Sequence, residues 1–315
     1  MSFKLGVDGG GTKTECIVVD DSGAIIASHR AGGSNPGIVG PDEARHVVVD
    51  AILALLTQPP VAGPARTIST TLLCMAGSRP FWRETAAGLT GLGRVIAVDD
   101  SLPVLELATG GLPGLVLHAG TGSFVAARAP REAVPAEVPV PHGEAVPFGV
   151  THYAGGLGWR FGDEGSGYDI GRRAVVRGLL ELQGWLPESG MGRMLQAYTG
   201  LQDANAISRD FSREKMANAR TAGLAPEVLR LAEEGNAAAL EIVVESTGKL
   251  LGLALRVVAT LFPETPANEI CAGLSGPILT RPIVARALRE RTLLDLKPVD
   301  AAPIEGVRRL LARLD

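Results

Sequence analysis

The sequence has few cysteines and no dense run of basic residues. Cys16, Cys74 and Cys271 are its three cysteines, and their odd number and wide spacing exclude a disulfide framework and a four-cysteine metal site. With 30 Lys and Arg against 34 Asp and Glu, the net charge of −4 offers no attraction to a nucleic-acid backbone. We therefore expect core thiols in a reducing compartment and no nucleic-acid partner.

Signals for secretion and membrane insertion are also missing. Lys4 and the strand-like GVDGGG follow Met1 closely, where a secretory leader would carry an apolar segment and a cleavage site. The longest uncharged stretch, Leu107 to Ala127, is long enough to cross a bilayer, but five glycines and a proline interrupt it. We expect a cytoplasmic protein that does not associate with membranes.

What the chain does have is enough apolar sequence for two globular domains. Its 315 residues are 46% hydrophobic and 20% charged, which is typical of packed cores and not of disordered chains. Apolar runs such as FKLGVD, TTLLCMAG and VIAVDD alternate with helical patterns, which favours an α/β fold. We expect an N-terminal lobe over residues 1–112 and a C-terminal lobe over residues 113–315, with a last helix at 304–314 that packs back on the first lobe.

Several further segments are predicted from apolar spacing and from their breakers. Helical spacing predicts helices over residues 41–56, near 81–92, over 236–262 and over 279–291. Residues 129–147 contain five prolines, which predicts an extended surface loop.

Two glycine turns stand between predicted strands, one in each lobe. The first runs from Gly9 to Thr14, directly after Asp8, and the second is Ala119 to Ser123. Glycines permit left-handed dihedrals and close approach of backbone N–H groups to phosphate. Neither turn has the spacing of a Walker loop or a dinucleotide fingerprint, and an ordinary hairpin would explain either one alone. Two such turns in separate lobes favour a shared polyphosphate ligand.

Carboxylates and a third glycine junction complete the candidate set. Asp8 ends a strand, where it can hold a hydrated Mg²⁺ through water. Asp100, with Asp99 before it, ends another strand, and from the residues alone it is either a functional carboxylate or a helix N-cap. The junction ICAGLSGPI, with Gly273 and Gly276, is either a surface for a purine or ribose or a plain helix entry.

Three segments resemble a known superfamily. GVDGGGTKTECIVVD and HAGTGSFVA resemble the two phosphate motifs of the actin, sugar kinase and Hsp70 ATPase superfamily. Residues 155–175, GGLGWRFGDEGSGYDIGRRAV, resemble the segment shared by N-acetylglucosamine kinases and the BadF/BadG/BcrA/BcrD ATPase family, whose members activate benzoyl-CoA reductase. The resemblance implies two ribonuclease H-like, actin-like ATPase lobes with MgATP in a cleft between them.

The resemblance also implies residue roles. Asp8 would organise Mg²⁺, Asp100 would be the general base, and Gly273 and Gly276 would border the adenosine. The phosphate-binding residues would be Gly9, Gly10, Gly11, Thr12, Lys13, Gly120, Thr121 and Gly122. The sugar would contact Asn35, Gly77 and Asp163. Ala76 departs from the family pattern, because related kinases often carry a hydroxyl there.

Together these features predict an ATP-dependent kinase that phosphorylates a hexose or amino sugar at the 6-hydroxyl. N-acetylglucosamine and glucosamine are the leading substrates, and the group at carbon 2 stays open. Two alternatives are an ATPase that activates a redox enzyme and a non-catalytic sugar sensor. His118 is expected to be a buried, hydrogen-bonded structural histidine, and the sequence leaves open whether the protein is a homodimer.

Overall fold

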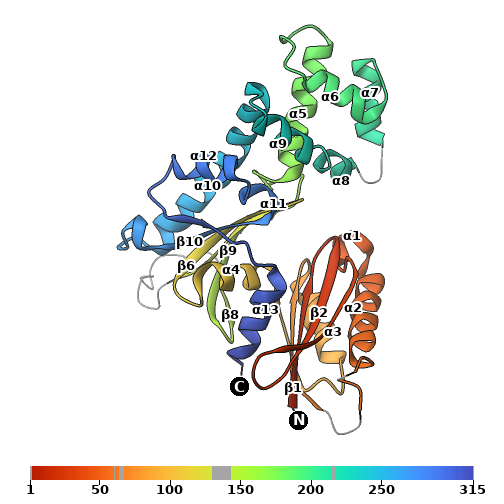
Figure 1. Ribbon diagram of the computed structural model, residues 1–315, viewed down its shortest axis with the longest axis vertical. Helices are drawn as coiled ribbons and strands as arrows, with labels where there is room; N and C mark the ends of the chain where they lie inside the picture. The colour runs from red at the N-terminus through yellow and green to blue at the C-terminus, as the bar shows by residue number, and fades with distance from the viewer. Residues whose placement is uncertain (1, 60, 64–66, 130–142, 214–216, 315) are drawn as a thin grey trace. The chain divides into compact units, whose positions relative to one another are not determined.

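The chain divides into two compact units, each built around its own β-sheet. The computed structural model describes residues 2–59, 61–63, 67–129, 143–213 and 217–314. One unit comprises Met1–Leu112, Glu144–Thr151 and Ala301–Asp315, and the other comprises Pro113–Gly143 and His152–Asp300 (Figure 1).

The sheet of the first unit has the strand order β3-β2-β1-β4-β5. Its strands are β1 (Ser2–Gly9), β2 (Lys13–Val19), β3 (Ile25–Gly32), β4 (Thr67–Met75) and β5 (Arg94–Asp99). β1, β2 and β3 pair antiparallel, while β4 and β5 run parallel to β1. Because β1, β4 and β5 are parallel, their carboxyl ends share one edge of the sheet, and Asp8, Met75 and Asp99 lie there.

Helices cover the two faces of this first sheet. They are α1 (Pro36–Val39), α2 (Pro41–Leu56), α3 (Arg79–Gly88), α4 (Ser101–Thr109) and α13 (Pro303–Ala312). Successive β1 side chains point to opposite faces: Leu5 and Val7 join the core that includes residues of α2, while the Lys4 Nζ donates to the Leu311 carbonyl of α13. α13 also contacts α4 (Figure 1), so the C-terminal helix packs on the face of the sheet opposite to α2.

The second sheet has the order β11-β10-β6-β7-β9-β8. Its strands are β6 (Gly114–Ala119), β7 (Ser123–Arg128), β8 (Gly143–Val146), β9 (Gly149–Gly155), β10 (Cys271–Ser275) and β11 (Leu296–Pro298). β6, β7 and β9 pair antiparallel, and β10 and β11 run parallel to β6. Its run β9-β7-β6-β10-β11 therefore repeats the order and directions of β3-β2-β1-β4-β5, so the two sheets share one topology.

The second unit is rich in helices. They are α5 (Gly167–Leu182), α6 (Met191–Thr199), α7 (Ala204–Arg213), α8 (Ala217–Ala222), α9 (Ala225–Glu233), α10 (Ala237–Leu261), the 3-10 turn η1 (Ala267–Glu269), α11 (Gly276–Leu279) and α12 (Pro282–Arg289). α10 begins where the sequence predicts, because the Asn236 side chain accepts the N–H of Ala239 at 3.0 Å. Its apolar side chains, such as Ile242, Leu250 and Ala254, enter the core of the unit.

Two sequence predictions are wrong in detail. The helix expected over residues 279–291 is two helices, because Pro282 disfavours helical dihedrals at Arg281, whose ψ is 130°. Residues 143–146, expected within a surface loop, form strand β8, while residues 130–142 of that loop lie outside the described part of the chain.

Candidate active site

The first glycine turn is tied to two neighbouring loops of its unit. The Gly9 carbonyl accepts the N–H of Ala76, and the Gly10 carbonyl accepts the N–H of Ser34, at 2.8 and 2.9 Å. A Cβ on Gly9 would lie 2.2 Å from the Met75 methyl carbon, so the absence of a side chain is required for this packing. None of Gly9, Gly10 and Gly11 has a left-handed φ, so the predicted left-handed dihedrals are wrong. Crowding explains Gly9 but not Gly10, where a Cβ would lie 3.6 Å from the Lys13 carbonyl oxygen.

The exposed part of the first turn carries the polar side chains. Thr12 and Lys13 are exposed, while Gly10 and Gly11 are half-buried. The Lys13 Nζ lies 2.5 Å from Glu15 Oε2, so this ammonium group is already held in an ion pair. Buried Thr14 donates to the Ser34 hydroxyl at 2.8 Å, which links the turn to the loop before α1.

Two predicted sugar contacts, Asn35 and Gly77, lie side by side in the first unit. Asn35 is the N-cap of α1, and its Oδ1 accepts the N–H of Gly37 at 2.9 Å. A Cβ on Gly77 would lie 2.8 Å from that same Oδ1, and Gly77 also has a φ of +96°. Both the left-handed backbone and the crowding therefore demand glycine at this position. Ala76, beside them, is buried, and its carbonyl accepts the indole N–H of Trp82.

The carboxylates Asp8 and Asp100 belong to the same edge of the first sheet. Asp8 precedes the last residue of β1 and is 8% exposed, while Asp100 directly follows β5 and is half-buried. Both oxygens of the Asp99 carboxylate have a partner. The Oδ2 accepts a hydrogen bond from Nε of Arg79 and lies 3.0 Å from Nη2 of the same residue, and the Oδ1 accepts the N–H of Ser101 at 3.0 Å. Asp100 makes no side-chain capping bond to α4. The N–H of Ser101 is bonded to Asp99 instead, and the Asp100 carboxyl has a side-chain hydrogen bond with Asp99.

Burial is the main cause that raises the pKa values of both carboxyls. Burial, and then the neighbouring charges of Asp99 and Asp8, raise the pKa of Asp100 to about 8. Burial raises the pKa of Asp8 to about 7, although the Lys13 ammonium opposes that shift. Two carboxyls with strongly raised pKa values at one sheet edge form a typical candidate for proton transfer or cation binding.

The second glycine turn lies against the start of helix α5. Gly120 donates its N–H to the Gly122 carbonyl, and its own carbonyl accepts the N–H of Gly167, the first residue of α5, each at 2.8 Å. Ser166 caps that helix through the N–H of Asp169. An exposed Thr121 thus stands beside a helix N-terminus, whose N–H groups and dipole favour anions.

Asp163 lies at this second turn. Its Oδ2 is 3.1 Å from the position that a Cβ on Gly122 would take, and its carboxylate accepts the backbone N–H groups of Ser123 and Gly158. Burial raises its pKa. Its φ of +61° is the one left-handed dihedral of a non-glycine residue among the residues described. A half-buried carboxylate with a left-handed backbone, placed against a glycine turn, is a feature that often occurs at functional sites.

The third glycine junction meets the second turn through His118 and Gly276. The His118 Nδ1 lies 3.2 Å from the Ser275 hydroxyl, and its ring stacks on Phe124. Burial lowers the pKa of His118 to about 4, so the ring is neutral at pH 7, in agreement with the predicted structural role. A Cβ on Gly276 would lie 2.3 Å from the Ala119 carbonyl oxygen, so this glycine packs directly on the end of β6.

The predicted residues therefore form two groups, one in each unit. In the first unit the glycine turn, the Asn35–Gly77 pair and the carboxylates Asp8 and Asp100 are connected through adjoining loops. In the second unit the turn 120–122, Asp163 and Gly276 adjoin one another. Gly273 is instead buried within β10, where it pairs with Val116. The sequence reasoning missed Arg79, which binds Asp99 from helix α3, because no local pattern marks a contact across 20 positions.

Among the described residues, no group of three or more His, Cys, Asp and Glu side chains is placed to bind a metal ion. In the same part of the chain, no helix has the length and apolar character needed to cross a bilayer.

The chain is similar in sequence to several known proteins. Residues 5–95 match the model of the BadF/BadG/BcrA/BcrD ATPase family. The chain is 26% identical over 271 residues to the N-acetyl-D-glucosamine kinase of Dictyostelium discoideum, a match that covers 82% of this chain and 79% of that protein. It is also 26% identical over 182 residues to the N-acetylmuramic acid/N-acetylglucosamine kinase of Clostridium acetobutylicum. That second match covers 57% of this chain and spans 54% of the relative's length.

A solved structure extends the likeness to the whole fold. A protein of Chromobacterium violaceum, which carries N-acetylglucosamine kinase as a provisional name, superimposes with a TM-score of 0.73 at 25% identity over 98% of each chain. The predicted fold class, α/β with two actin-like ATPase lobes, is confirmed, and so is the resemblance to N-acetylglucosamine kinases and to the ATPase family.

Proposed function

We propose that this protein is an ATP-dependent kinase that transfers the γ-phosphoryl group to the 6-hydroxyl of an amino sugar, N-acetylglucosamine or glucosamine. The observation that carries the proposal is that three candidate binding elements lie in adjoining loops of the first unit. They are the glycine turn, the neighbouring residues Asn35 and Gly77, and Asp100, whose carboxyl does not cap α4. Relatives named as sugar kinases support the same conclusion.

In this proposal the two glycine turns bind the phosphates of ATP. Gly9, Gly10, Gly11, Thr12 and Lys13 would contribute from the first unit, and Gly120, Thr121 and Gly122 from the second. The N-terminus of α5, which adjoins Gly120, adds a favourable field for negative charge. Gly276, with no side chain over the end of β6, would leave room for the adenosine, and Gly273 would lie behind it within the strand.

Asp8 is the residue that would hold Mg²⁺. A buried carboxylate with a pKa raised to about 7 is stabilised by a nearby cation, and carboxylate oxygen is a donor that Mg²⁺ prefers. One protein carboxylate suits Mg²⁺, which keeps several waters and takes its remaining ligands from substrate phosphates. When bound, Mg²⁺ would neutralise charge on the phosphates as the reaction proceeds.

Asp100 would act as the general base. Its carboxylate accepts the proton of the sugar hydroxyl while that oxygen attacks the γ-phosphorus, and the bond to the bridging oxygen breaks to release ADP. Asn35 and Asp163 would orient the sugar hydroxyls, with Gly77 giving the ring close access to Asn35. Because Asp100 must be ionised to accept a proton, the rate should rise with pH as this carboxyl loses its own.

The cysteines favour a kinase over an activator of a redox enzyme. An activator of that type needs accessible thiolates for an iron-sulfur cluster. Burial raises the pKa of the Cys16 thiol to about 12 and that of Cys74 well above its usual range. Cys271, at the start of β10, is half-buried, and no other cysteine is near it in the sequence.

The test is ADP release over a panel of amino and neutral hexoses. We expect one sugar to be strongly preferred and ATP hydrolysis without sugar to be slow. Equal, sugar-independent hydrolysis across the panel would favour the ATPase alternative. ATP bound without turnover, with any sugar, would favour a sensor.

A further inference from the structure

Helix α3 carries an arginine that engages the carboxylate next to the proposed base. Arg79 is the first residue of α3, and its Nε and Nη2 lie 3.1 and 3.0 Å from Asp99 Oδ2. The other oxygen of Asp99 accepts the N–H of Ser101 at 3.0 Å. Each oxygen of Asp99 therefore has a defined partner, one from α3 and one from the first residue of α4.

These contacts fix the backbone on both sides of Asp100. The bond from Ser101 N–H to Asp99 spans Asp100, which has helical dihedrals of φ −67° and ψ −12°. A residue enclosed by such an Asx-type turn has little freedom to rotate its backbone. The direction of the Asp100 side chain thus depends on where Asp99 is held, and Arg79 holds it.

The ion pair between Arg79 and Asp99 is only partly screened by water, because the Arg79 side chain is 37% exposed and that of Asp99 is 18% exposed.

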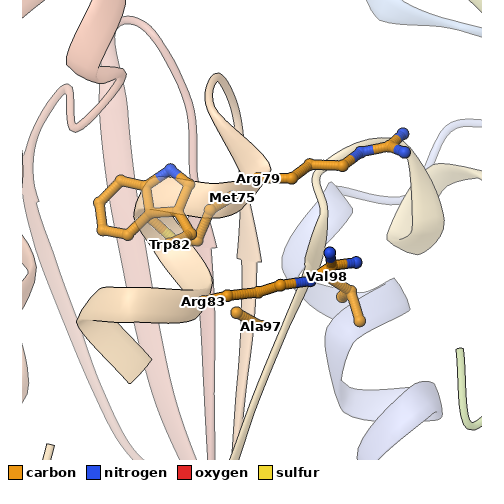
Figure 2. Close-up of a pocket in the computed structure, with 6 residues that line it drawn as sticks. All are labelled: Met75, Arg79, Trp82, Arg83, Ala97 and Val98. Atoms are coloured by element: carbon orange, nitrogen blue, oxygen red, sulfur yellow. The ribbon is translucent and has the colours of Figure 1, made fainter. Parts of the chain in front are cut away.

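The pocket beside Arg79 is too small to bind a sugar or a nucleotide. Figure 2 shows Arg79 and Arg83 extending in the same direction from α3, with Arg83 reaching toward Val98. The pocket that both line, with Met75, Trp82 and Ala97, has a volume of about 10 Å³. That volume holds about one water molecule and excludes a sugar or a nucleotide.

We propose that Arg79 is a positioning residue for the kinase reaction, which holds Asp99 so that the carboxylate of Asp100 faces the incoming sugar hydroxyl. This inference rests on the proposed function. In this role Arg79 contacts neither the substrate nor the metal.

The experiment measures kcat and both KM values for four variants. Arg79→Met removes the charge and keeps the length of the side chain. Arg79→Lys keeps the charge but loses the forked contact. The double variant Arg79→Met/Asp99→Asn removes both charges together. Arg83→Met, one turn along the same face of α3, is the matched control.

We expect Arg79→Met to lower kcat about 10- to 100-fold with little change in either KM, because the base is misplaced after substrates bind. Arg79→Lys, whose ammonium group can still pair with Asp99, should restore part of the lost kcat. The double variant should stay as slow as Arg79→Met, because Asp99→Asn does not restore the contact with α3. Arg83→Met should behave as the wild type does.

The inference fails if Arg79→Met has the kcat of the wild type. It also fails if Arg79→Met raises the KM values and leaves kcat unchanged, or if Arg83→Met reproduces the loss of kcat, since that last result indicates helix packing alone. Urea unfolding of each variant shows whether the variant still folds. If Arg79→Met does not fold, kcat and KM of Arg79→Lys are compared with those of the wild type instead. If the wild type transfers no phosphoryl group to any sugar, the proposed function fails instead.

Discussion

Replacement of Asp100 by asparagine should stabilise the ligand-free protein at pH 8. In the folded protein the Asp100 carboxyl has a pKa of about 8, against 3.8 for an ordinary aspartate. Between those values the folded state keeps a proton that the unfolded chain releases. The free energy of unfolding therefore falls as pH rises through this range. Asparagine cannot ionise, so the variant escapes this loss.

The size of the effect follows from the pKa difference. A shift from 3.8 to about 8 corresponds to about 5 kcal/mol at pH 8, with about 1.4 kcal/mol for each pKa unit. Water reaches the half-buried carboxyl and screens part of this penalty. We expect Asp100→Asn to gain about 2–3 kcal/mol over the wild type when the change is measured at pH 8 relative to pH 4.5. Taking the difference between two pH values cancels any packing change that asparagine introduces.

The assay is urea unfolding followed by the fluorescence of Trp82. This indole is 1% exposed in the core of the first unit. Trp159→Phe and Trp185→Phe remove the other two of the three tryptophans, which leaves Trp82 as a reporter for that unit. Asp21→Asn, the same change at an exposed turn, is the control and should show no pH-dependent gain. A stability difference between Asp100→Asn and wild type that does not change with pH would refute the reasoning.

Three further predictions concern individual positions. Gly77→Ala should raise the sugar KM about 10-fold by displacing Asn35, whereas Gly40→Ala, with a similar φ of +91° and no atom within 4 Å, should share the backbone strain but keep the KM. Gly9→Ala should lower the free energy of unfolding by about 1–3 kcal/mol in urea, because the added Cβ meets a methionine methyl; wild-type stability would contradict this packing. Since the pKa of His118 is lowered to about 4, the second unit should lose about 2–3 kcal/mol from pH 7 to 4.5. Hydrogen exchange in β6 and β10 measures this, and His118→Gln should remove the loss; an unchanged pH dependence would argue against it.

The parts of the site that the sequence predicted are those encoded locally. The first glycine turn is recognisable because Asp8 and GGG stand between two strand patterns, and α10 is recognisable because Asn236 precedes a long apolar repeat. Both features depend on neighbours within a few residues, which is the range over which periodicity and capping act.

The parts that the sequence did not predict depend on contacts between distant segments. The residues alone allowed Asp100 to be the cap of α4, and the structure shows that the Ser101 N–H is bonded to Asp99, which Arg79 holds from 20 positions away. Likewise, Met75 of β4 crowds Gly9, whereas the sequence reasoning considered left-handed dihedrals and close approach to a ligand. Packing across parallel strands has no signature within a single segment.

The most direct test of phosphoryl transfer is proton-coupled ³¹P NMR of the product formed from ATP and the preferred amino sugar. We expect a new phosphomonoester signal split into a triplet, because a phosphate on the primary 6-oxygen couples to the two protons of carbon 6. A doublet would place the phosphate on a ring carbon, and inorganic phosphate alone would show that water, not a sugar, receives the group.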